Sequence, residues 1–103
     1  MSYCAIIENP DAGREKFEQL RAHLRDTGAF PPDGQRLLIA GPTDHGWRVI
    51  SVWDSEEALE RFYTEALPAA CAAVDIQYAR MSRTTFEVHT LVAGDLTAMP
   101  QPA

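Results

Sequence analysis

Apolar and polar residues recur with regular spacing along most of the chain, and this spacing predicts six main elements. Helical periodicity, with charged residues opposite the apolar stripe, predicts a helix that follows Asn9 and ends at Gly28. A second helix is expected over 54–67, with Pro68 starting a further short helix. Apolar runs rich in β-branched and aromatic residues predict strands over 3–8, 35–41, 46–53 and 84–92.

The starts of both helices carry recognisable signals. Asn9 is the expected N-cap of the first helix, because Pro10 after it suits the first helical position. Asp54 is the expected N-cap of the second helix, since Glu57 three residues later completes a capping-box-like start.

The predicted order of elements is β-α-β-β-α-β, which is typical of ferredoxin-like domains. Right-handed crossovers place both helices on one face of a four-stranded antiparallel sheet, so the expected class is α+β. A chain of 103 residues suits one domain, which we place at residues 1–94, with a C-terminal tail over 95–103 that is rich in Pro and small residues.

The third predicted strand, GWRVISVW over 46–53, is apolar on both faces. Trp47, Val49, Ser51 and Trp53 share one face, whereas Arg48, Ile50 and Val52 share the other. Helices cover only one face of such a sheet, and an exposed apolar face marks an interaction surface. The pattern therefore predicts a homodimer.

Composition and charge narrow the function classes. With 15 acidic and 9 basic residues, the formal net charge of −6 argues against nucleic acid and anionic membrane surfaces as partners. No apolar run approaches the ~20 residues of a spanning helix, and no basic start precedes the first apolar run. Two cysteines, Cys4 and Cys71, form no disulfide framework, so we expect free thiols and a cytoplasmic protein.

Two stretches, AGPTDHGWRVISVWDSEEALERF and the late FEVH, resemble the dimeric α+β barrel superfamily. Within it, the chain is most similar to small actinobacterial proteins grouped with antibiotic biosynthesis monooxygenases. The resemblance covers residues 3 to 92 and implies a homodimer with its sheets packed face to face and a ligand cavity in each subunit. It leaves the chemistry open, because the superfamily includes cofactor-free oxygenases, haem-dependent enzymes, cyclases, decarboxylases and isomerases. The Asn-Trp pair of the quinone-forming monooxygenases is missing around Trp53, since the only asparagine is Asn9.

The aromatic residues of the third strand are the first candidates for a substrate site. Trp47 and Trp53 either pack in the core or form a flat wall for an apolar cyclic or polyketide-like substrate. Ser51 lies between them and could supply a hydroxyl. Tyr63 and Tyr78 lie on or after the second helix, in a region that closes one end of the cavity in this architecture.

Two histidines are the candidate catalytic residues. His89 lies on the last predicted strand, two residues from Glu87, and is our candidate general base. His45 lies in the turn TDHG and is the second candidate, although a solvated loop pair with Asp44 is the simpler interpretation.

No metal-ligand spacing, phosphate-binding glycine cluster or Gly-x-Ser-x-Gly motif is present, so we expect neither a metal nor another cofactor. Two functions remain. One is a cofactor-independent tailoring enzyme (oxygenase, cyclase or isomerase), and the alternative is a non-catalytic ligand-binding or structural dimeric barrel.

Overall fold

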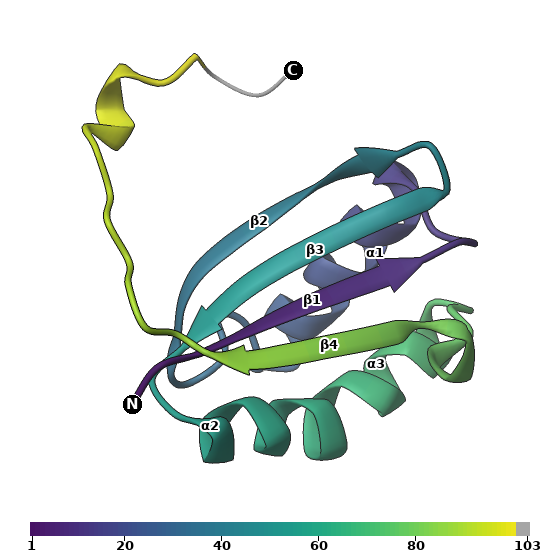
Figure 1. Ribbon diagram of the computed structural model, residues 1–103. Helices are drawn as coiled ribbons and strands as arrows, with labels where there is room; N and C mark the ends of the chain where they lie inside the picture. Colours follow the sequence, from purple (N-terminus) through teal and green to yellow (C-terminus); the bar gives the residue numbers. More distant parts are fainter. Residues whose placement is uncertain (101–103) are drawn as a thin grey trace.

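In a computed structural model, which describes residues 1–100, the chain forms a four-stranded antiparallel sheet (Figure 1). The spatial order is β2-β3-β1-β4, with β1 and β3 in the centre. The ferredoxin-like α+β fold predicted from the order of elements is therefore confirmed. The strands are β1 Tyr3–Asn9, β2 Gln35–Thr43, β3 Gly46–Trp53 and β4 Ser82–Glu87.

The helices follow the predicted order but differ from it in detail. The second and third helices form one nearly continuous segment, because a π-helical turn joins them (Figure 1). No helix within residues 1–100 combines the length and the apolar character needed to cross a membrane. The segments are α1 Arg14–Asp26, α2 Glu56–Arg61, the π turn η1 Phe62–Ala66, α3 Leu67–Ala73, and the short 3₁₀ turns η2 Tyr78–Arg80 and η3 Leu96–Ala98.

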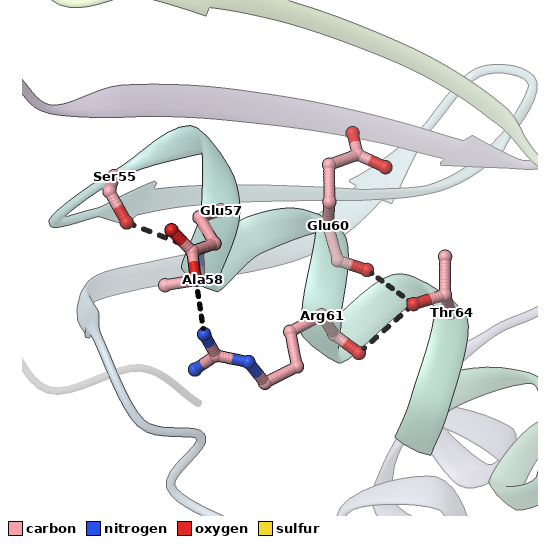
Figure 2. A network of polar contacts seen from close by, with 6 residues as sticks. All are labelled: Ser55, Glu57, Ala58, Glu60, Arg61 and Thr64. Carbon is pink, nitrogen blue, oxygen red and sulfur yellow. Dashed lines mark hydrogen bonds and ion pairs between the residues drawn. The ribbon is translucent and has the colours of Figure 1, made fainter.

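Both predicted N-caps are wrong in position. Asn9 is the last residue of β1, and its side-chain oxygen accepts a hydrogen bond from the Asp11 amide in a turn, so α1 starts only after Gly13. Ser55, rather than Asp54, caps α2, because its hydroxyl accepts from the Ala58 amide at 3.1 Å (Figure 2). Asp54 instead forms a two-bond ion pair with Arg36.

The two faces of the sheet have different surroundings. Pairing between β1 and β3 sets Ala5 opposite Ser51 and Ile7 opposite Val49 on the face that the helices cover. Because neighbouring residues of a strand point to opposite faces, the intervening residues form a second surface, which we call the open face. Its apolar members are Cys4, Ile6, Leu37, Ile39, Ile50, Val52 and Phe86.

The last strand is shorter than predicted. β4 ends at Glu87 rather than near residue 92, because β4 pairs only with β1 and β1 starts at Tyr3. One further bond follows, from the Val88 amide to the Ser2 carbonyl at 2.8 Å. Beyond it, residues 89–100, which we call the arm, run away from the sheet and helices (Figure 1). Of the predicted tail over 95–103, residues 101–103 lie outside the described part of the chain.

Candidate functional site

A cavity of about 80 Å³ lies between the helix-covered face of the sheet and the helices. Its surface is almost entirely apolar, as is usual for sites that bind small organic molecules. Aromatic rings come from all sides, including Trp47 on the sheet, Phe17 on α1 and Tyr63 on η1. Other lining residues include Ile7, Asn9, Leu20, Arg21, Leu24, Phe30, Leu38, Val49, Ser51, Phe62, Leu67, Ile76 and Met81.

The position of Trp47 depends on the glycine before it. Gly46 adopts a φ of 138°, and a Cβ atom there would lie 2.3 Å from the Asn9 carbonyl oxygen. Only glycine therefore lets β3 start this close to the end of β1. As a result, Trp47 lies directly opposite Asn9 in the sheet, and both are buried lining residues of the cavity. The indole ring packs on Phe17 of α1, with ring centroids 5.4 Å apart.

The π turn places two consecutive aromatic residues in the cavity wall. Phe62 and Tyr63 both line the cavity, and their rings meet edge to face with centroids 5.5 Å apart. Pro68 explains why the turn widens, since proline has no N–H and its ring clashes with the carbonyl four residues earlier. The Leu67 amide accordingly bonds the Phe62 carbonyl, five residues back. At the start of the turn, the Thr64 hydroxyl donates to the carbonyls of Glu60 and Arg61 (Figure 2).

Tyr78 completes the π turn from outside the helix. The Tyr63 carbonyl has no backbone donor in either helical register, because the Leu67 amide bonds Phe62 and Pro68 has no N–H. The Tyr78 hydroxyl donates to this carbonyl at 3.0 Å. Tyr78 therefore stabilises the part of the cavity wall that Tyr63 forms, although Tyr78 itself does not line the cavity.

A buried polar cluster lies next to the cavity. The Trp53 indole N–H donates to the Ser51 hydroxyl at 2.9 Å, and both residues are buried. Burial raises the pKa of the Tyr63 phenol above its usual value, while the nearby Ser51 hydroxyl and the Arg83 guanidinium lower it in part. The Tyr63 side chain is consequently neutral at physiological pH and can donate a hydrogen bond, but it is a poor proton acceptor.

An open depression of about 520 Å³ lies next to the cavity, between α1 and the β2–β3 edge. Phe17, Arg21, Leu38 and Trp47 line both hollows and so form the boundary between them.

The structure brings together three of the residues that the sequence singled out for substrate binding. Trp47, Ser51 and Tyr63 line the cavity. Trp53 does not, because its fully buried ring packs against the rings of Phe62 and Tyr63 in the core. Tyr78 also lies outside the lining and supports the π turn instead.

The two predicted catalytic histidines lie elsewhere. His89 follows β4, is exposed, and its Nδ1 lies 2.6 Å from the Thr90 hydroxyl. The prediction that it lies on the fourth strand is wrong, because the strand ends at Glu87. His45 is exposed in the β2–β3 turn, where its amide donates to the Thr43 hydroxyl. Neither belongs to the cavity lining, so this placement gives no support to their predicted catalytic roles.

Sequence reasoning missed Arg21, Asn9 and Phe62 as lining residues. Arg21 lies on the same side of α1 as Phe17 and Leu24, and this arginine beside an apolar stripe was the available signal. Asn9 was assigned to a helix cap. Phe62 was overlooked because its helical spacing suggested only a core residue of the second helix.

Metal-binding chemistry finds no support in the part of the chain that the structure describes. No group of three His, Cys, Asp or Glu side chains lies close enough together there to hold a metal ion. Both cysteines are buried free thiols, with Cys4 on the open face and Cys71 on the core side of α3.

Comparison with solved structures identifies the fold. The TM-score is 0.60 to Rv0793 from Mycobacterium tuberculosis, over 90% of this chain and 100% of that one, at 17% identity. A dimeric ferredoxin-like protein of unknown function from Jannaschia sp. CCS1 gives 0.59, over 85% and 100%, at 11% identity. This chain therefore shares the ferredoxin-like fold of these proteins.

An enzyme also shares this fold. SnoaB from Streptomyces nogalater, a cofactor-independent oxygenase, gives a TM-score of 0.55 at 15% identity. The match covers 90% of this chain and 96% of SnoaB. Neither a protein-family model nor a curated protein matches the sequence. The suspected resemblance to monooxygenase-like proteins is thus confirmed at the level of fold.

Proposed function

We propose that this chain is a cofactor-independent tailoring enzyme that binds a small, largely apolar, cyclic molecule in the cavity between sheet and helices. The observation that carries the proposal is the lining itself. Rings of Phe17, Trp47, Phe62 and Tyr63 surround a space with few polar groups, and Ser51 supplies a hydroxyl in its wall. Flat aromatic walls favour a flat apolar ligand.

The polar groups around the cavity favour a reaction that relies on the substrate's own reactivity. Among the lining residues within 1–100 there is no Asp, Glu or His. Ser51, Tyr63 and the Asn9 amide can donate hydrogen bonds to oxygen atoms of a substrate. Such donors stabilise the anion of a cyclic ketone or phenol. A carbanion of this kind is what cofactor-free oxygenation needs, and the SnoaB comparison supports that reaction class.

A non-catalytic ligand-binding protein is the second candidate. The same absence of a carboxylate or imidazole from the lining favours it, because no side chain there is suited to accept a proton at neutral pH. Binding without turnover is the outcome that separates it from the enzyme.

We further propose that the protein is a homodimer that packs open face on open face. Ile39 and Phe86 of that face are about half exposed, at 53% and 50%. The arm adds more exposed apolar side chains, namely Leu91, Val92, Leu96 and Met99. A second copy would remove both surfaces from water. Two of the solved proteins with this fold are described as dimeric, which supports the assignment.

A cavity-filling substitution tests the proposed site. Val49→Phe introduces a ring into the cavity from β3. It should abolish the binding of bicyclic hydroxyarenes such as 1,3-dihydroxynaphthalene, which calorimetry measures. Oxygen uptake and mass spectrometry of the products then report turnover. Turnover in the wild type that is lost in Val49→Phe is the expected result.

Ala72→Phe is the matched control, since Ala72 is exposed on α3 and gains the same ring outside both the cavity lining and the open face. Its binding and turnover should equal those of the wild type. Binding that survives Val49→Phe would show that the cavity is not the site. Binding without any turnover would favour the second candidate.

A further inference from the structure

Two hydrogen-bond donors at the boundary between cavity and depression bear on the chemistry of the ligand, provided that the proposed function holds. Trp47 is only 8% exposed, and its indole Nε1 has neither solvent contact nor a hydrogen-bond partner within residues 1–100. Burying an N–H without a partner costs free energy, so such groups usually have one.

Arg21 supplies the second unpartnered donor. Its Nε is also buried without a partner among the described residues. The guanidinium carbon lies 5.7 Å from the centre of the Phe17 ring and 5.3 Å from that of Phe30, so two rings confine the group. One terminal nitrogen, Nη1, is already engaged by Glu18 at 3.0 Å. The Nε is therefore a buried donor that no described group uses.

Both donors belong to residues at the same boundary. Trp47 and Arg21 each line the inner cavity and the outer depression, and the Phe17 ring contacts both side chains. The inner lining holds no acidic side chain, and the carboxylate at the rim, Glu18, is paired with Arg21. A group that reaches this boundary meets the two donors beside the Arg21–Glu18 ion pair, and Arg14 adds a further positive charge to the depression.

We propose that this boundary binds an anionic oxygen carried on the ring of the ligand, with Trp47 Nε1 and Arg21 Nε as its two donors. The aromatic side chains hold the cyclic part of the ligand in the inner cavity, and the anionic oxygen lies at the boundary with the depression. The ligand class is therefore an aromatic or alicyclic acid, or an enol or phenol bound as its anion. A charged acceptor is favoured over a neutral one, because a hydrogen bond with an ionised donor or acceptor is stronger than one between two neutral groups.

A matched pair of probes tests the anion site. 2-Naphthoate and 2-methylnaphthalene have the same ring and similar shape but differ in the anionic oxygen, and calorimetry or ligand-observed NMR gives both affinities. The wild type should bind the carboxylate about 10-fold tighter or more, as a charge-assisted hydrogen bond implies. Trp47→Phe keeps a ring but removes the N–H, and Arg21→Met keeps the aliphatic stem but removes the donors. Each should bring the ratio of affinities close to one.

Two further variants separate geometry from charge. Arg21→Lys keeps the positive charge without Nε, and it should lose most of the preference for the carboxylate. Arg25→Met removes the same charge from an exposed position on α1 and should leave the ratio unchanged. Thermal unfolding of each variant shows that it is folded.

The outcomes distinguish this proposal from the proposed function. If 2-methylnaphthalene binds but the carboxylate gains nothing, the anion site is wrong and the cavity still binds an apolar ring. If the preference persists in Trp47→Phe and Arg21→Lys, these donors are not the site. If neither probe binds, the proposed function fails, and the anion site fails with it.

Discussion

The two cysteines are both buried, but in different parts of the molecule. Cys71 is fully buried in the core, whereas Cys4 lies on the open face of the sheet. Burial raises the pKa of the Cys71 thiol to about 11, since the thiolate would lose its hydration. The pKa of the Cys4 thiol is raised as well, for the same reason. Neither thiol is therefore activated as a nucleophile at neutral pH.

The raised pKa of Cys71 predicts a specific loss of stability at alkaline pH. The folded state holds this proton more tightly than the unfolded chain, so its contribution is complete below pH 9 and disappears as pH rises towards 11. A shift of this size corresponds to about 2–3 kcal/mol. Urea unfolding of the wild type and Cys71→Ala at pH 8 and pH 11 should show the stability difference changing by that amount. A difference that stays constant would contradict the prediction.

At the scale of the element, the π turn between α2 and α3 depends on two residues that are distant in sequence. Pro68 removes a backbone donor, and the Tyr78 hydroxyl replaces it at the Tyr63 carbonyl. Tyr78→Phe should therefore destabilise the fold by about 1–3 kcal/mol, because it leaves a buried carbonyl unpaired. Tyr3→Phe is a suitable control, since no hydrogen bond from the Tyr3 hydroxyl is found within residues 1–100.

A double-mutant cycle tests the mechanism rather than the size of the effect. Pro68→Ala restores a backbone N–H that can reach either helical register, so Tyr78→Phe should cost less in that background than in the wild type. Additive losses in urea unfolding would show that Tyr78 and Pro68 act independently.

The elements also show where sequence reasoning succeeds and where it stops. Strand alternation correctly assigned Trp47, Val49, Ser51 and Trp53 to one face, because that periodicity is set by the backbone. Alternation did not separate cavity from core on that face. Ser51 lines the cavity, whereas Trp53, two residues later, packs against an aromatic ring from η1 and lies in the core. That distinction depends on the π turn, which combines the local effect of Pro68 with a hydrogen bond from Tyr78, 15 residues beyond Tyr63.

Strand ends are equally non-local. Residues 84–92 have strand-like composition throughout, but β4 stops at Glu87 because β1 offers no partner beyond Tyr3. His89, the predicted general base, therefore lies beyond the strand on which the sequence placed it. Arg21 was overlooked because its charge suggested a solvated side chain, whereas its stem and Nε are enclosed by aromatic rings.

For the whole molecule, the open face and the arm predict the assembly. Light scattering at micromolar concentration should give twice the 11.4 kDa of the chain. Ile39→Glu places a charge on the open face and should shift the population towards monomer, since an unpaired charge is costly in an apolar interface. Ala40→Glu is the matched control, because this neighbouring residue on β2 points to the other face. A dimer unaffected by Ile39→Glu would place the interface elsewhere.

The arm makes a separate contribution to the same equilibrium. Leu91→Ser together with Leu96→Ser removes two exposed apolar side chains without adding charge. If these side chains pack on the partner, the dimer dissociation constant should rise about 10-fold or more, as loss of buried leucine surface implies. An unchanged constant would leave the open face as the whole interface.

The π turn also has an evolutionary consequence. In a helix, such a turn amounts to one inserted residue, and each residue of an α-helix advances the side chains by about 100°. A relative whose helix is regular at this point would carry one residue fewer between Ser55 and Cys71. An alignment without that gap would match Tyr63 to a residue with a different orientation. In lineages of this fold, the cavity wall could thus change through the gain or loss of a single codon, with every flanking residue conserved.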